Sequence, residues 1–396
     1  MLLVALNNEG KRTIYRPLLG VAIYIVVAAT VSVIAGNAVQ KILFDIRGLM
    51  TMLASAYVAY HLLGSTIQAA LVRSIRWILW ISGILVLASS VFGITLAGRS
   101  EEAGLYLTSG GFTASDATRL IVSTTDLALV VLASLTAVVV VGRYSFKLAL
   151  PMFVPAFVIV FLGFSRNSLL GVAAASIFAV VAALSWQSLR KLALFLSAAV
   201  VLVAGTIALL SVSPAASWLQ AQLTGFQTRV LDGLTRAAFR TDTSILYRTS
   251  EAEHLIAAFR RSPLFGNGFG YAYQPPQGPM GTFWGDQAPY YAHNFYLWLL
   301  AKAGLLGAII FCFVAVVPLV RGIRTATPVR LIVTSGSMAA LAVSLVAPMP
   351  LGTNSSVAIG GILGLAFGAL MDQRSRDSFP SGPAGRRAGR VRRRGI

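Results

Sequence analysis

Three side chains in the sequence could assist the transfer of a group away from a phosphate. Arg166 and Arg248 each carry a planar fork of N–H donors that matches the oxygens of a phosphate or diphosphate. His293 carries an imidazole, whose ordinary pKa near neutrality lets it remove a proton from a hydroxyl. Together these residue types favour a reaction in which a hydroxyl attacks and a diphosphate leaves.

Each of these residues also has a purely structural interpretation. His293 could lie at the start of a helix, with its ring bonded to a nearby carbonyl. Arg166 could be an interfacial arginine that reaches lipid headgroups, and Arg248 could pair with Glu251 or with a headgroup. The spacing alone does not separate these interpretations. Which one holds depends on the elements that position the three residues.

The composition predicts that these elements lie in a membrane. Hydrophobic residues make up 57% of the 396-residue chain, charged residues make up 11%, and the mean hydropathy is +0.77. A soluble protein needs charged residues at about a quarter of its positions. With one cysteine and three histidines, the chain has no disulfide framework, and we expect neither a metal site nor a cofactor.

The apolar runs predict an all-α integral membrane protein with about ten transmembrane helices and one large extracytoplasmic loop. Each run is long enough to cross a hydrocarbon layer about 30 Å thick, with allowance for tilt. Helices 1–7 are predicted within residues 18–212 and helices 8–10 within residues 294–371. The runs lie near Leu18–Val39, Leu49–Val72, Trp77–Gly98, Thr118–Val141, Phe146–Phe164, Ser168–Trp186, Leu192–Val212, Asn294–Leu319, Leu331–Pro350 and Ser356–Met371.

The positive charges predict the orientation of this multi-pass chain. If residues 1–17 are cytoplasmic, most lysines and arginines fall on the cytoplasmic side, and residues 372–396 form a basic, disordered cytoplasmic tail. Both termini are therefore predicted to be cytoplasmic. The net charge of +19 reflects this asymmetry, so the expected partner is the lipid bilayer and not a nucleic acid.

One long segment, residues 213–293, is then left outside, and function is expected to concentrate there. Apolar residues at every third or fourth position predict an amphipathic helix over residues 219–238. A second helix is predicted over residues 244–261, ended by Ser262–Pro263. Residues 262–292 are rich in glycine, proline and aromatic side chains, which predicts an irregular loop over the mouth of a cavity.

The predicted topology brings the three side chains to the outer membrane surface. Arg166 follows Ser165 in a short turn before the sixth run, and Arg248 lies on the second loop helix. His293 lies where the loop meets the eighth run. A lipid-linked diphosphate would lie at this same boundary, and aromatic side chains of the loop could stack on its sugars or form the usual interfacial belt.

His293 and Asn294 begin the stretch HNFYLWLLAKAGLLG, which contains Gly304 and Gly307. The eleven-residue step from His293 to Gly304 is about three helical turns, so a continuous helix would place Gly304 below the histidine. Small residues there would let a neighbouring helix approach closely.

Three segments, taken in order, resemble the O-antigen ligase/polymerase superfamily of membrane glycosyltransferases. They are the Ser165–Arg166 pair, the passage Ser244–Gly270 (SILYR to SPLFGNGFG) and the H-N-x9-G-x-x-G stretch His293–Gly307. The resemblance covers mainly residues 150–320. It implies an enzyme of the bacterial inner (cytoplasmic) membrane that transfers a glycan from an undecaprenyl diphosphate carrier to an acceptor hydroxyl at the extracytoplasmic face. It also implies an inverting reaction without a metal ion.

The resemblance also implies roles for individual residues, carried over by their positions in the motifs. His293 would be the catalytic base, and Arg166 and Arg248 would bind the donor diphosphate. Four further residues would support the site: Ser165, Asn294, Gly304 and Gly307. The sugar is left open, and so is the acceptor, which could be a glycan, a lipid or a protein.

Two other functions remain open. A polysaccharide polymerase of the superfamily would extend the glycan on its lipid carrier. Such polymerases generally have two large external loops, whereas this chain has one and a short segment at Arg99–Ala117, which favours a ligase. A polysaccharide or lipid transporter without transferase activity typically has repeated halves, and the sequence shows no internal repeat.

Two charged residues are predicted inside the membrane. Asp126 and Lys302 each lie eight residues from the outer end of a predicted helix, about 12 Å deep at about 1.5 Å per residue. Because a lone charge at that depth is costly, we expect these two residues to form a salt bridge.

Overall fold

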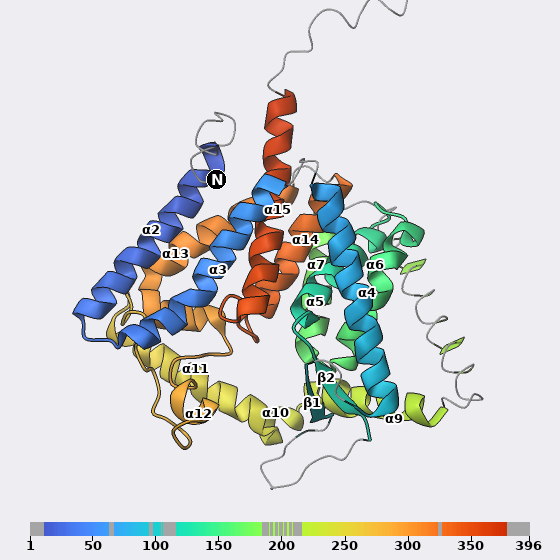
Figure 1. Ribbon diagram of the computed structural model, residues 1–396, viewed down its shortest axis with the longest axis horizontal. Helices are drawn as coiled ribbons and strands as arrows, with labels where there is room; N and C mark the ends of the chain where they lie inside the picture. Colours follow the sequence, from blue (N-terminus) through green and yellow to red (C-terminus); the bar gives the residue numbers. More distant parts are fainter. Residues whose placement is uncertain are drawn as a thin grey trace, which may run out of the picture.

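The computed structural model describes residues 12–62, 67–94, 98–103, 105, 116–183, 216–323 and 327–377, with isolated residues between 190 and 208. In these residues the chain is mainly helical (Figure 1). The long helices lie side by side, and the shorter elements gather at one end of them. The start of the first described helix and the end of the last one lie at the opposite end.

Three helices in the described part of the chain are long and apolar enough to cross a membrane. They are α3 (Val39–Leu62), α4 (Gln68–Phe92) and the first 26 residues, Phe295–Val320, of α13 (Phe295–Ile323). Shorter apolar helices lie in α2 (Arg12–Ile34), α5 (Thr125–Val140), α6 (Phe146–Leu162), α7 (Arg166–Ala182), α14 (Pro328–Val343) and α15 (Thr353–Asp377).

The prediction of a mainly helical, strongly apolar chain is confirmed, while the number of spans and their orientation stay predictions. The predicted seventh span, Leu192–Val212, lies largely outside the described residues, as do residues 1–11 and 378–396. Helix α15 continues to Asp377, so the first residues of the tail predicted to be disordered are helical.

One predicted boundary is wrong because hydropathy ignores polar residues that are satisfied inside a helix. The second run was predicted to start at Leu49, but α3 begins at Val39 and includes Lys41 and Asp45. The all-α prediction also missed a short antiparallel hairpin, β1 (Arg99–Glu102) and β2 (Thr118–Ile121). No apolar periodicity marks strands of this length.

The loop helices are confirmed in one case and corrected in the other. The predicted helix 244–261 is α11 (Thr243–Arg261). The predicted helix 219–238 is divided into α9 (Ala216–Phe226), a π-helical segment, a 3-10 turn and α10 (Ala238–Thr241). Gly225 and Gly233 lie within this stretch, and glycine weakens a regular helix.

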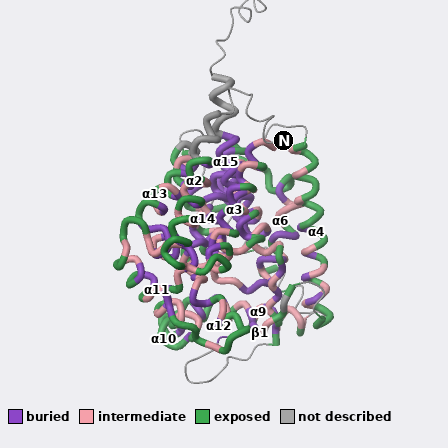
Figure 2. The backbone as a smooth tube through the Cα atoms, turned by 60° about the vertical axis from the view of Figure 1, so that its left-hand side comes forward, coloured by how far each residue is buried: buried purple, intermediate pink, exposed green. Residues whose placement is uncertain are grey.

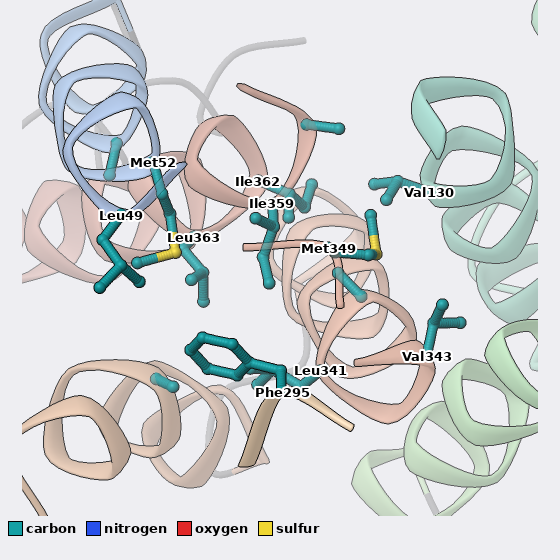
Figure 3. Close-up of a cluster of buried hydrophobic side chains, with 14 of the residues drawn as sticks. Leu49, Met52, Val130, Phe295, Leu341, Val343, Met349, Ile359, Ile362 and Leu363 are labelled. Atoms are coloured by element: carbon teal, nitrogen blue, oxygen red, sulfur yellow. The ribbon is translucent and has the colours of Figure 1, made fainter. Parts of the chain in front are cut away.

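Within the core, α3 packs closely against α15. Glycines permit the contact, because a Cβ at Gly360 or Gly364 would lie within 2.2 Å of a backbone oxygen of α3. Figure 3 shows Leu49 and Met52 of α3 facing Ile359 and Leu363 of α15. Buried residues concentrate along α3, α14 and α15, whereas α4 is largely exposed (Figure 2). An exposed apolar helix is the pattern expected of a surface that faces lipid.

Candidate functional site

Helix α11 carries two residues of the candidate site, Arg248 and Glu251. Asp242 caps its first turn, with Oδ1 accepting the N–H of Ser244 at 2.9 Å. Further along the helix, Glu251, Leu255 and Ala258 are buried at intervals of four and three residues, so they form one stripe. A carboxylate therefore lies on the apolar face of the helix, where it needs a polar partner.

That partner is His293. The backbone N–H of His293 donates to Glu251 Oε2 at 2.7 Å, and the ring Nδ1 lies 3.2 Å from Oε1. The Glu251 side chain is 2% exposed, whereas that of His293 is 27% exposed. A carboxylate at Nδ1 orients the ring and accepts the Nδ1 proton in a hydrogen bond. The other nitrogen, Nε2, is then left free to accept a proton. The histidine does precede a helix, but its ring contacts a carboxylate and not a backbone carbonyl.

Tyrosines surround this Glu251–His293 pair. The rings of Tyr247 and Tyr291 contact the imidazole edge-on, with ring centroids 5.8 and 5.6 Å from it. The hydroxyl of Tyr273 lies 3.2 Å from Glu251 Oε1. Burial, and then the charge of Glu251, raise the pKa of Tyr273, so its hydroxyl stays protonated, and the nearest acceptor for its single proton is the backbone carbonyl of Tyr291.

Arg248 lies one helical turn before Glu251 and has an unsatisfied donor. Its Nε is buried and has no hydrogen-bond partner. Burial, and then the nearby charge of Arg166, lower the pKa of Arg248, while Glu251 and Asp242 act in the opposite direction. Both carboxylates already have other partners, Glu251 in His293 and Asp242 in Arg166. A buried donor without a partner costs free energy, so this position favours an anionic ligand.

Arg166 lies beside Arg248 but is already partly engaged. Its Nη2 donates to Asp242 Oδ2 at 2.8 Å and its Nη1 to the carbonyl of Gly233 at 2.9 Å. The side chain is 17% exposed and binds protein groups, whereas the alternative interpretation had it reach lipid headgroups. Ser165 precedes it as the extended N-cap residue of α7. The arginine thus joins the start of α7 to the start of α11, and its charge lies near enough to affect Arg248.

Gly304 interrupts α13, contrary to the continuous helix that was predicted. Its φ of 64° and ψ of −168° are non-helical. A Cβ at this residue would lie 2.4 Å from the carbonyl oxygen of Leu264, so the neighbour that approaches is a loop and not a helix. Four backbone N–H groups join the loop and the break: Leu305 to Pro263, Leu306 to Leu264, Asn267 to Ala301 and Gly268 to Lys302. Two of the recognised sequence motifs therefore hold each other in place.

The two remaining supporting residues have structural roles. Asn294 caps α13, because its Oδ1 accepts the backbone N–H groups of Tyr296 and Leu297. Gly307 makes room for Tyr24 of α2, whose hydroxyl would lie 2.8 Å from an added Cβ. Both residues fix the position of the helix that follows His293.

The predicted salt bridge between Asp126 and Lys302 is wrong. Lys302 Nζ donates to Asp45 Oδ2 at 2.6 Å and to the carbonyl of Tyr271 at 2.6 Å, and both charged side chains are buried. The prediction placed Asp45 in a turn outside the membrane, because α3 was expected to begin too late. Asp126 lies in the first turn of α5.

We expect Gly304→Ala to prevent correct docking of the loop at residues 262–271. An alanine would need a backbone conformation that is essentially restricted to glycine and would overlap Leu264. The expected result is faster cleavage by protease within the loop and a lower midpoint of thermal unfolding. Gly361→Ala is the matched control, because its added Cβ meets no atom within 4 Å. Equal behaviour of the two variants would contradict this account of the break.

Sequence reasoning missed Glu251 as a functional residue, although a signal was present. A glutamate in register with Leu255 and Ala258 marks a polar residue on a buried face. Asp242 and Tyr273 carry no such signal, because their partners come from other elements. Among the described residues no group of three His, Cys, Asp or Glu side chains is placed to hold a metal ion.

Residues 151–312 match the family model for O-antigen ligases. The match runs from α6 to α13 and includes Arg166, Arg248, Glu251 and His293. The resemblance identified from the sequence motifs is therefore confirmed. A comparison with curated proteins gives no match.

Proposed function

We propose that this membrane protein transfers a glycan from a polyprenyl diphosphate carrier to an acceptor hydroxyl. The match of residues 151–312 to the family model for O-antigen ligases supports the proposal. The observation that carries the proposal is the Glu251–His293 pair beside Arg248, whose buried Nε has no partner. This transfer needs a base close to an anion site, and Glu251, which binds His293, lies one helical turn from Arg248.

In the proposed reaction, His293 Nε2 takes the proton of the acceptor hydroxyl as its oxygen bonds to the anomeric carbon of the donor sugar. The bond from that carbon to the diphosphate oxygen breaks, and the diphosphate leaves with the electron pair. Glu251 stabilises the imidazolium that forms. Arg248 and the neighbouring Arg166 stabilise the negative charge that grows on the diphosphate. Attack opposite the leaving group inverts the anomeric centre.

A transfer assay with the purified protein and lipid-linked glycan tests the proposal. A ligase moves the glycan to an acceptor and releases the carrier diphosphate, without a transmembrane gradient. If the product is a longer glycan on the same carrier, the protein is a polymerase. If no glycosidic bond forms and the lipid-linked glycan only changes leaflet, the protein is a transporter and the proposal is overturned.

We expect Arg248→Ala to weaken donor binding and to slow transfer together, each by about tenfold or more. The physical reason is that contacts to the diphosphate exist before the reaction and strengthen as it leaves. Arg248→Lys should recover only part of both, since lysine keeps the charge and loses the fork. Donor affinity and single-turnover rate are the measurements.

The control for this prediction is Arg260→Ala, which removes an exposed arginine from the same helix. If Arg248→Ala binds the donor normally, the diphosphate does not bind at Arg248.

We propose that the end of the molecule with α9–α12 faces the extracytoplasmic side of a bacterial inner membrane, with both termini in the cytoplasm. The location of the shorter elements at one end supports this orientation (Figure 1). After Cys312→Ser, a cysteine at Gln220 should react with an impermeant thiol reagent in intact cells, and a cysteine at Ser381 should not. The reverse labelling pattern would contradict the orientation and the proposed donor.

A further inference from the structure

A cavity lies beside the start of α3, among residues that the proposed reaction does not use. Its volume is about 220 Å³, and it is lined by Gln40, Lys41 and Phe44 of α3 and by Asp286 and Gln287 of the loop before His293.

The cavity lies between two elements that are fixed to each other. Lys41 Nζ donates to the backbone carbonyl of Asp286 at 2.7 Å and lies 4.7 Å from the centre of the Tyr290 ring. The Asp286 side chain is held in turn, because its Oδ2 accepts the N–H of Gly281 at 3.0 Å. Lys41 and Asp286 are therefore held in place before any ligand arrives, which lowers the entropy cost of binding.

The lining combines donors, acceptors and one aromatic ring. Gln40 and Gln287 are exposed, and each amide can both donate and accept. Asp286 adds a carboxylate acceptor, and Lys41 has three ammonium protons, of which one is directed at a carbonyl. Phe44 supplies an apolar ring face. Neighbouring sugar hydroxyls need donors and acceptors together, whereas a phosphate would meet the like charge of Asp286.

The cavity is connected to the proposed catalytic residue through one short turn. The carbonyl of Gln287 accepts the N–H groups of Tyr290 and Tyr291 at 2.9 and 3.0 Å, and the ring of Tyr291 contacts His293. In Figure 1, α12 (Phe283–Asp286) lies toward the start of α3, while α10 and the hairpin lie toward the other side. Arg166 binds Asp242, which directly follows α10, so the proposed diphosphate site lies on that other side.

We infer that this cavity binds an uncharged sugar of the acceptor, on the side of His293 away from the donor diphosphate. The inference rests on the proposed transferase function, since only that function supplies an acceptor. The acceptor is therefore a glycan or a glycosylated lipid, with a sugar near the hydroxyl that attacks.

Binding can be tested without turnover, on the purified full-length protein carrying His293→Ala. Saturation-transfer NMR with the methyl glycosides of glucose, galactose, mannose and N-acetylglucosamine should show binding of at least one glycoside. Adding Gln40→Ala and Gln287→Ala should weaken that binding about tenfold or more, because each amide contributes about one hydrogen bond. Gln220→Ala, which changes an exposed glutamine of α9, should leave it unchanged. Absence of binding, or equal binding by the double variant, overturns the inference.

The transfer assay distinguishes an acceptor site from a donor site. Gln287→Ala in the otherwise unaltered protein should raise KM for the acceptor about fivefold and leave the donor KM unchanged. A rise in the donor KM alone would overturn the assignment to the acceptor. If glycosides bind as expected but the protein forms no glycosidic bond under any condition, the proposed function fails while the sugar site stands. If the protein transfers glycan but Gln287→Ala leaves the acceptor KM unaltered, the proposed function stands and the acceptor site fails.

Discussion

Replacing His293 with alanine is expected to lower the rate of glycan transfer by about 10²–10⁴-fold while changing donor affinity little. The base acts on the acceptor hydroxyl in the transition state, and in the proposed reaction it makes no contact with the bound diphosphate. Single-turnover rate and donor affinity are measured on well-folded protein. His254→Ala is the matched control, because His254 lies on α11 and its Nδ1 lies 2.8 Å from the carbonyl of Ser250 in the preceding turn.

Glu251→Gln extends this prediction to the carboxylate behind the histidine. Glutamine keeps the shape of the side chain but loses the charge that orients the imidazole and stabilises its protonated form. The rate should fall by a similar factor, and the double variant should be no slower than His293→Ala alone, since the two residues act as a unit. Independent, multiplying losses would show that Glu251 acts through something other than His293. A full rate for His293→Ala would make another group the base.

The second large effect is expected on stability. Lys302→Met should destabilise the protein by about 3–5 kcal/mol, because it leaves the buried carboxylate of Asp45 without its cation. Asp45→Asn should cost a comparable amount, since it leaves Lys302 unpaired and weakens the acceptor for the N–H of Gly270. The midpoint of thermal unfolding in detergent is the measurement. Lys147→Met, at an exposed position of α6, is the control.

The double variant makes this prediction specific to the pair. If Asp45 and Lys302 contact each other, changing both residues should cost clearly less than the sum of the single changes. Strictly additive losses would argue against the contact. The same cycle with Asp126→Asn in place of Asp45→Asn should be additive, because the structure pairs Lys302 with Asp45.

Composition and motif order were enough to predict the class of the protein and several candidate site residues. The apolar character is a property of each segment alone, so composition was sufficient to predict a mainly helical membrane protein. Helix α11 could also be predicted, since its periodicity and its ending at Ser262 are local. The order of the motifs identified Arg166, Arg248 and His293, because a motif keeps residue types at fixed spacings whatever surrounds them.

The partners of these residues could not be predicted from the sequence, because they depend on how distant segments pack. Glu251 lies 42 residues before His293, and Asp45 lies 257 residues before Lys302. Sequence spacing does not predict contacts between residues that lie so far apart in the chain. The break at Gly304 was equally hidden, because a glycine in an apolar run is compatible with a straight helix until a loop supplies the missing hydrogen bonds. A charged residue in a membrane segment must find a partner. Which partner it finds depends on how the helices pack, and the pattern of a single helix does not contain that information.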